Sequence, residues 1–230
     1  MTWINNHFLL FILILASVMT FLWLLCFVKR LRMKWPIALL LAVLHVAFGV
    51  FCVKAFAFLE SGAASDGFSK MSIFGATFFM PVGYFLGAKL TKRKIADVFD
   101  IFTICMVFTL ACSRVNCLKA GCCGGIPFFG TSWTWPTREI EIIYYLALIL
   151  IFAPRILKQK TNGEVYPLYM LSYGALRFLL EFVRISGVAR PLHLTHLWAA
   201  LSMAAGLAVF LVLKDREKRK RKIKTVNKKS

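Results

Sequence analysis

The stretch "NHFLLFILILASVMTFLWLLCFVKRLRMK", residues 6–34, decides the fold class. A long apolar run without any Asp, Glu, Lys or Arg ends at once in a cluster of four basic residues. About 20 apolar residues in an α-helix cross a bilayer core of about 30 Å. The run lacks the alternation of apolar and polar residues that a strand of a transmembrane barrel shows. It therefore predicts a membrane-spanning helix over residues 6–28.

The rest of the chain repeats this pattern, and 60% of its 230 residues are hydrophobic. Six further apolar runs cover residues 35–59, 71–90, 98–118, 140–157, 165–183 and 195–213. The sequence therefore predicts an all-α integral membrane protein with about seven transmembrane helices. We expect residues 1–213 to form a single membrane domain, followed by a basic, disordered tail over residues 214–230.

The net charge of +19 is distributed in a way that predicts orientation. Basic clusters follow the first, third and fifth runs, at residues 29–34, 89–94 and 155–160, and ten of the 29 Lys and Arg lie in the tail. Basic loops remain on the cytoplasmic side of a membrane. We therefore expect the N-terminus outside and the C-terminus in the cytoplasm. The tail is expected to attract anionic lipid, and no nucleic-acid partner is predicted.

The segment "RVNCLKAGCCGG", residues 114–125, begins the longest connection, which reaches Arg138. On this topology it is an outward or re-entrant loop between the fourth and fifth helices. Glycines such as Gly121 let backbone N–H groups approach an anion closely. The alternative is a re-entrant loop that only anchors the helix ends.

Four of the seven cysteines lie in or next to this segment with the spacing C-x4-C-x4-C-C. These are Cys112, Cys117, Cys122 and Cys123. A zinc site commonly has a second cysteine pair or histidines, which this run lacks, so no metal site is predicted. A disulfide, a cysteine nucleophile and simple packing remain open.

Charged residues within the apolar runs are candidates for function, because a buried charge in a membrane costs several kcal/mol without a partner. Glu141 lies about one turn into the fifth helix, and Arg177, Glu181 and Arg184 share one face of the sixth. Together with Arg114, they give a surplus of arginine over acid, which suits a phosphate group and hence a phospholipid. The alternatives are a purely structural ladder of ion pairs and, for Glu141, an acid stabilised by the helix dipole.

Histidines are weaker candidates. His193 and His196 flank the start of the last helix on the outer side, and His196 is the candidate proton acceptor. A packing role is the alternative for both.

The motifs "SRVNCLKAGCCGG", "WPTREIE" and "YGALRFLLEFVR", in this order, resemble those of the bacterial prolipoprotein diacylglyceryl transferases. The resemblance implies a seven-span enzyme of the bacterial cell membrane with an extracytoplasmic active face. It implies transfer of a diacylglyceryl group from phosphatidylglycerol to the lipobox cysteine of a prolipoprotein signal peptide, with release of glycerol phosphate. No cofactor is implied, and we expect a monomer.

The resemblance and the charge pattern together predict the site. The predicted catalytic residues are Arg114, Arg177, Glu181 and His196. The predicted substrate-binding residues are Asn116, Gly121, Glu141, Tyr173 and Arg184.

Several positions depart from the family pattern. Ser113 and Asn116 stand where the family has glycine, Trp135 and Arg138 stand in place of histidine and glutamine, and Phe74 stands where many members carry a histidine. The alternative prediction is therefore a divergent membrane protein on the same scaffold. Such a protein binds a phospholipid or a partner without catalysis, or acts on another acceptor.

Overall fold

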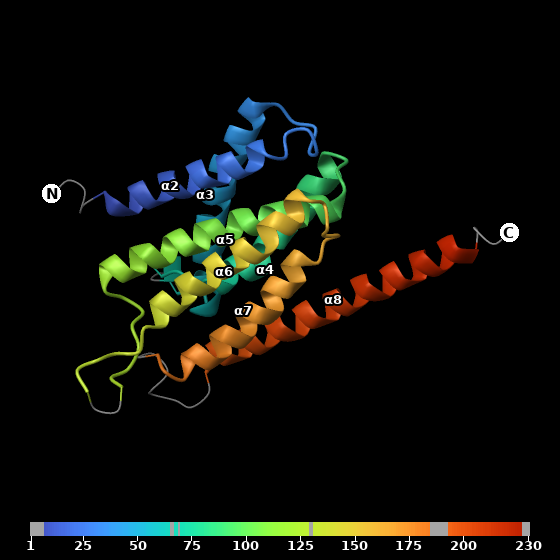
Figure 1. The fold of residues 1–230 in the computed structure, drawn as a ribbon. Coiled ribbons are helices and arrows are strands. Elements are labelled where there is room, and N and C mark those ends of the chain that lie inside the picture. Colours follow the sequence, from blue (N-terminus) through green and yellow to red (C-terminus); the bar gives the residue numbers. More distant parts are fainter. Residues whose placement is uncertain (1–6, 65–66, 69, 129–130, 185–192, 227–230) are drawn as a thin grey trace.

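The computed structural model describes residues 7–64, 67–68, 70–128, 131–184 and 193–226, and over these ranges the fold is a helical bundle (Figure 1). The helices are α2 (Phe8–Leu25), α3 (Trp35–Glu60), α4 (Phe74–Leu90), α5 (Ile95–Ala120), α6 (Thr137–Leu157), α7 (Val165–Glu181) and α8 (Leu194–Val226). The described ranges contain only two isolated β-bridges and no strand. The predicted all-α class is confirmed.

Five of these helices, α2, α3, α5, α6 and α8, are long and apolar enough to cross a membrane. The other two, α4 and α7, have 17 residues each and coincide with the third and sixth predicted runs. Large apolar side chains face outward along the bundle, as expected where lipid takes the place of water. The chain is therefore a multi-pass membrane protein.

Helix α5 lies at the centre of the bundle and packs against α2, α3, α4, α6 and α7. Ile101, Ile104 and Cys105 on this helix are fully buried. The indole N–H of Trp23 on α2 donates a hydrogen bond of 3.0 Å to the carbonyl oxygen of Ile101. The helix that carries Arg114 is therefore fixed by neighbours on several sides.

Helices α7 and α8 form the closest pair, and glycine allows their approach. A Cβ atom on Gly174 would lie 2.7 Å from the carbonyl oxygen of Ala199, and one on Gly206 would lie 2.7 Å from that of Pro167. Small residues commonly permit such close contact between membrane helices. This contact holds the helix that carries Arg177 rigidly against the last helix.

The basic connections between helices gather at one end of the bundle. Arg30 donates a hydrogen bond of 2.9 Å to the carbonyl of Ile156, and Arg93 donates one of 3.3 Å to the carbonyl of Arg32. These bonds join the connections that follow α2 and α4 to each other and to the last turn of α6. Helix α8 finishes at the same end, opposite to the end at which α2 begins (Figure 1).

Helix α8 continues beyond the last apolar run and through part of the basic tail, to Val226. Ion pairs one turn apart support this extension, including Asp215 with Arg219 at 2.8 Å. Lysine, arginine and glutamate are also good helix formers. The structure describes residues 214–226 as helix, and residues 227–230 lie outside the described part.

Candidate functional site

At the end of the bundle opposite to the basic connections, the ends of α5, α6 and α7 bring buried charges together. Arg114, in the last turns of α5, grips Glu141, in the first turns of α6. Nη2 of Arg114 lies 2.9 Å from Oε1 of Glu141, and Nε lies 2.5 Å from Oε2. Both residues are buried, with 3% and 2% of their surface exposed. The contact is an ion pair that includes one hydrogen bond, which Nη2 of Arg114 donates to Oε1 of Glu141.

Arg177 on α7 connects this pair to a second carboxylate. Its Nη1 lies 3.8 Å from Oε1 of Glu141, and its Nη2 lies 2.8 Å from Oε2 of Glu181. Glu181 also lies 3.7 Å from Nη1 of Arg184 and 3.5 Å from Nε2 of His193. The charges therefore form a continuous network in which arginines and glutamates alternate.

The network carries more positive than negative charge, since three guanidinium groups surround the carboxylates of Glu141 and Glu181. Arg114 and Arg177, the two arginines predicted as catalytic, both contact Glu141, whereas Arg184 contacts Glu181. Arg114 and Arg177 are nevertheless paired with internal acids.

Tyrosine rings form one wall of the network. Tyr173, one helical turn before Arg177, is fully buried, and its ring lies 6.0 Å from that of Tyr145 and 5.5 Å from that of Tyr169. Tyr145 was not predicted as a site residue. Its position four residues after Glu141 on α6 places both on one helix face, which is the signal that could have found it.

The two histidines at the start of α8 differ in their neighbours. His196 is 3% exposed and packs against Phe178 and Phe182, with ring centroids 5.0 and 4.6 Å away. Its Nδ1 accepts a hydrogen bond of 3.4 Å from the backbone N–H of His193. The histidine whose ring reaches Glu181 is therefore His193, whereas His196 was the predicted one.

Two predicted binding residues lie outside the ion-pair network. Asn116 is half-buried on α5, and none of the contacts that join the described charges includes it. Gly121 ends α5 with φ of +67°, a left-handed conformation that glycine adopts without strain. Its visible role is to turn the chain from α5 into the connecting loop.

The loop after Gly121 folds back over the end of α5 and is anchored to α6 and α7. The hydroxyl of Thr137 donates a hydrogen bond of 3.0 Å to the carbonyl of Cys123, and the backbone N–H of Ile126 donates one of 2.9 Å to the carbonyl of Val183. Gly125 also forms an isolated β-bridge with Arg184. The loop therefore lies directly beside the charged network.

All seven cysteines lie within the described ranges, and all are free thiols. The pKa of the Cys123 thiol is lowered to about 4. A hydrogen bond from the Cys117 thiol is the largest cause, burial opposes it, and the charges of Arg184 and Arg114 lower the pKa further. The thiol groups of the loop are thus electrostatically connected to the arginines of the network.

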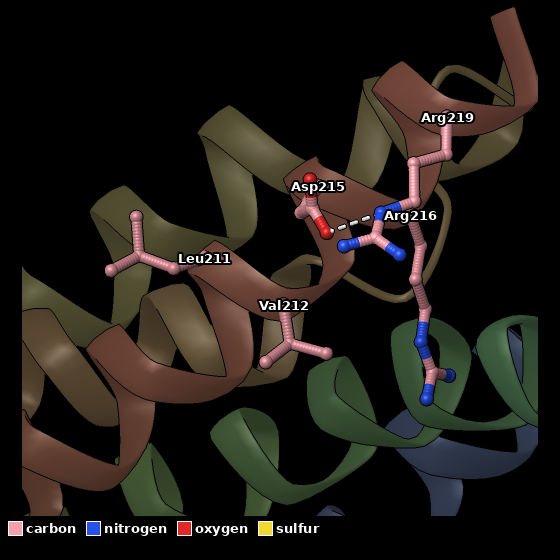
Figure 2. A pocket seen from close by; sticks show the side chains of 5 residues that line it. All are labelled: Leu211, Val212, Asp215, Arg216 and Arg219. Atoms are coloured by element: carbon pink, nitrogen blue, oxygen red, sulfur yellow. Dashed lines mark ion pairs between the residues drawn. The ribbon is translucent and has the colours of Figure 1, made fainter.

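A separate hollow lies at the other end of the molecule, on the extension of α8 (Figure 2). Figure 2 shows the ion pair between Asp215 and Arg219 that borders it. Both side chains are largely exposed to solvent, and such a pair holds no ligand by itself. The hollow is therefore a solvated surface feature.

Known proteins match this chain in sequence. The family model described as prolipoprotein diacylglyceryl transferase matches residues 11–214. A phosphatidylglycerol–prolipoprotein diacylglyceryl transferase of Dehalococcoides mccartyi strain BAV1 is 26% identical over 182 residues, which is 72% of this chain and 69% of that protein. A transferase of the same name from Clostridium tetani is 27% identical over 128 residues, which is 49% of this chain and 51% of that protein.

No solved structure gives a significant match. The family match extends over most of the chain, from α2 to the start of the basic tail, and it includes α5, α6 and α7, which carry the network. The chain therefore belongs to the prolipoprotein diacylglyceryl transferase family.

Proposed function

We propose that this protein transfers a diacylglyceryl group from phosphatidylglycerol to the lipobox cysteine thiol of a prolipoprotein and releases glycerol phosphate. The observation that carries the proposal is the network of Arg114, Arg177 and Arg184, which among the described residues surrounds the buried carboxylates of Glu141 and Glu181. A surplus guanidinium charge at the edge of a membrane suits the phosphodiester of a phospholipid. The names of the related proteins support the same reaction.

The topology that fits this reaction has seven membrane spans, with the N-terminus outside and the C-terminus in the cytoplasm. The basic connections gather at one end of the bundle and the arginine network lies at the other. Basic segments remain in the cytoplasm, so the network would face outward in the cell membrane of a bacterium. A secreted lipobox segment would reach it there.

The arginines would act on the leaving group. The substrate thiolate attacks the glycerol carbon of the diacylglyceryl group and forms a thioether, while the bond from that carbon to the phosphate oxygen breaks. Arg177 and Arg184 would stabilise the negative charge of the departing glycerol phosphate, which is most useful in a site without water. Arg114 would hold Glu141, and Glu141 would orient Arg177.

The thiol of the substrate must lose its proton before it attacks. Glu181 with His193 is the acceptor that fits best, because Nε2 of His193 lies 3.5 Å from Oε1 of Glu181. In His196, Nδ1 already accepts a backbone hydrogen bond, so a neutral ring carries its proton on Nε2. A role for His196 in packing against Phe178 and Phe182 is therefore the better assignment.

The proposal is tested with purified protein in vesicles of phosphatidylglycerol labelled in its acyl chains, together with a lipobox peptide. We expect the label to pass to the peptide as a thioether and glycerol phosphate to appear in equal amount. Arg177→Ala should abolish both products. Arg155→Ala is the matched control, because this exposed arginine lies at the basic end of α6 and should retain full transfer.

Two results would contradict the proposal. If the folded Arg177→Ala protein transferred the label normally, the arginine network would not serve the reaction. If the wild-type protein bound phosphatidylglycerol but formed neither thioether nor glycerol phosphate with any lipobox peptide, the scaffold would act as a non-catalytic phospholipid-binding protein.

A further inference from the structure

Three cysteine thiols meet beside the network although the sequence spacing did not predict a metal site. The sulfur atoms of Cys117, Cys122 and Cys123 all lie within 4.8 Å of one another. Cys117 comes from the last turn of α5, and the other two come from the loop beyond Gly121. The left-handed turn at Gly121 reverses the chain, so residues five and six positions later in the sequence return to the same point.

The geometry points to a zinc site in which Cys117, Cys122 and Cys123 supply three thiolate ligands. Zinc–sulfur bonds of about 2.3 Å place the sulfur atoms of a tetrahedral site about 3.8 Å apart. The observed separations reach that arrangement with sulfur movements of about 1 Å, which side-chain rotation supplies. The assignment does not depend on the proposed function.

The backbone around these thiols is already held in place. Cys123 has φ of +61°, an unfavourable conformation for a residue with a side chain. The carbonyl of Cys123 accepts a hydrogen bond of 3.0 Å from Thr137, and that of Cys122 accepts one of 3.4 Å from Arg138. The start of α6 therefore fixes both loop cysteines opposite Cys117.

The charge around the thiols also suits a bound zinc ion. Three thiolates and one Zn²⁺ carry a net charge of minus one. The loop that carries Cys122 and Cys123 forms a β-bridge with Arg184 at Gly125, so the positive charge of this arginine lies near the thiolates and would stabilise the complex. Three protein ligands leave a fourth position for water, and Cys122 is the exposed member of the cluster, on the side from which water would enter.

A disulfide is the alternative, but it would account for only two of these three thiols. Adjacent Cα atoms lie about 3.8 Å apart across a trans peptide, below the usual separation for a disulfide, which disfavours a bond between Cys122 and Cys123. A bond from Cys117 to either partner would leave the third thiol unpaired within the cluster. A metal ion accounts for all three sulfur atoms together.

The test uses the full-length protein in detergent, reduced and freed of metal, and titrated with Zn²⁺ against a chromophoric chelator. We expect one zinc ion per chain, and a thiolate-to-metal absorption band when Co²⁺ replaces Zn²⁺. Cys117→Ser, Cys122→Ser and Cys123→Ser should each weaken binding by more than the roughly 10–100-fold that loss of an outer-shell partner costs. Cys26→Ser, at the far end of α2, is the matched control and should bind zinc as the wild type does.

A second measurement on the wild-type protein covers the case in which a variant does not fold. Zinc should protect Cys117, Cys122 and Cys123 from alkylation, as mapped by mass spectrometry, and leave the exposed Cys26 reactive. The assignment is overturned if the reduced protein binds no stoichiometric zinc, or if binding survives these substitutions. It is also overturned if Cys117 forms a disulfide that persists when zinc is supplied under reducing conditions.

Discussion

Carboxylates are buried in two regions of this bundle, and the two regions differ in the groups that pair with them. At the basic end, Asp100 on α5 has no exposed surface and accepts hydrogen bonds from the backbone N–H groups of Gly163, at 2.8 Å, and Val165, at 3.1 Å. At the opposite end, Glu141 and Glu181 are paired with the side chains of arginines. Both arrangements compensate a buried negative charge.

The difference lies in what surrounds each charge. The N–H donors around Asp100 belong to the backbone at the start of α7, so they cannot move without unfolding that segment. The donors around Glu141 are long side chains that can change partners, and they carry a surplus of positive charge. A buried acid held by backbone groups therefore has a structural role. On the proposed function, by contrast, arginines that outnumber their acids would move from a carboxylate to the substrate anion.

Glu141→Gln should produce the largest effect on function. Glutamine has nearly the same shape, but it removes the negative charge that holds Arg114 and Arg177 together, and the two guanidinium groups would then repel each other. We expect the rate of diacylglyceryl transfer to fall by about 100-fold or more, a loss typical for a group that organises transition-state charge. The rate is measured per folded molecule in the vesicle assay.

Glu139→Gln is the matched control for this change, since Glu139 is half-buried in the first turn of the same helix. It should leave the transfer rate nearly unchanged. Equal losses in both variants would mean that negative charge at the start of α6, and not the contact with the arginines, supports the reaction.

Asp100→Asn should separate stability from function. The amide group of asparagine can accept only one of the two backbone N–H bonds, so one buried donor loses its partner. We expect the free energy of unfolding to fall by about 1–3 kcal/mol. Thermal unfolding in detergent measures this loss, and the transfer rate per folded molecule should stay at the wild-type level. A reduced rate at unchanged stability would contradict the structural role of Asp100.

The sequence predicted the helices well because a membrane span can be recognised from the composition of its own segment, without knowledge of how that segment packs. It also predicted that Glu141 is a functional candidate, because a buried charge in a membrane is too costly without a partner. It could not predict that Arg177 contacts Glu141 as well as Glu181, since this depends on how α6 and α7 pack. The meeting of Cys117 with Cys122 and Cys123 was missed for a related reason: it depends on the turn at Gly121, which spacing alone does not reveal.

Lys214→Ala should have the smallest effect. It tests whether burial is the reason why the buried charges contribute more to stability than this exposed one. Nζ of Lys214 lies 3.0 Å from Oε2 of Glu164 and 3.8 Å from Oε2 of Glu217, but 44% of the lysine side chain is exposed. Exposed pairs of this kind stabilise a protein by about 1 kcal/mol or less, because water and salt screen the charges. We expect little change in unfolding temperature and none in transfer rate. A loss of stability as large as that of Asp100→Asn would show that the contact between α8 and the start of α7 stabilises the protein more than its exposure suggests. The distance between charges would then decide stability at the basic end more than their burial does.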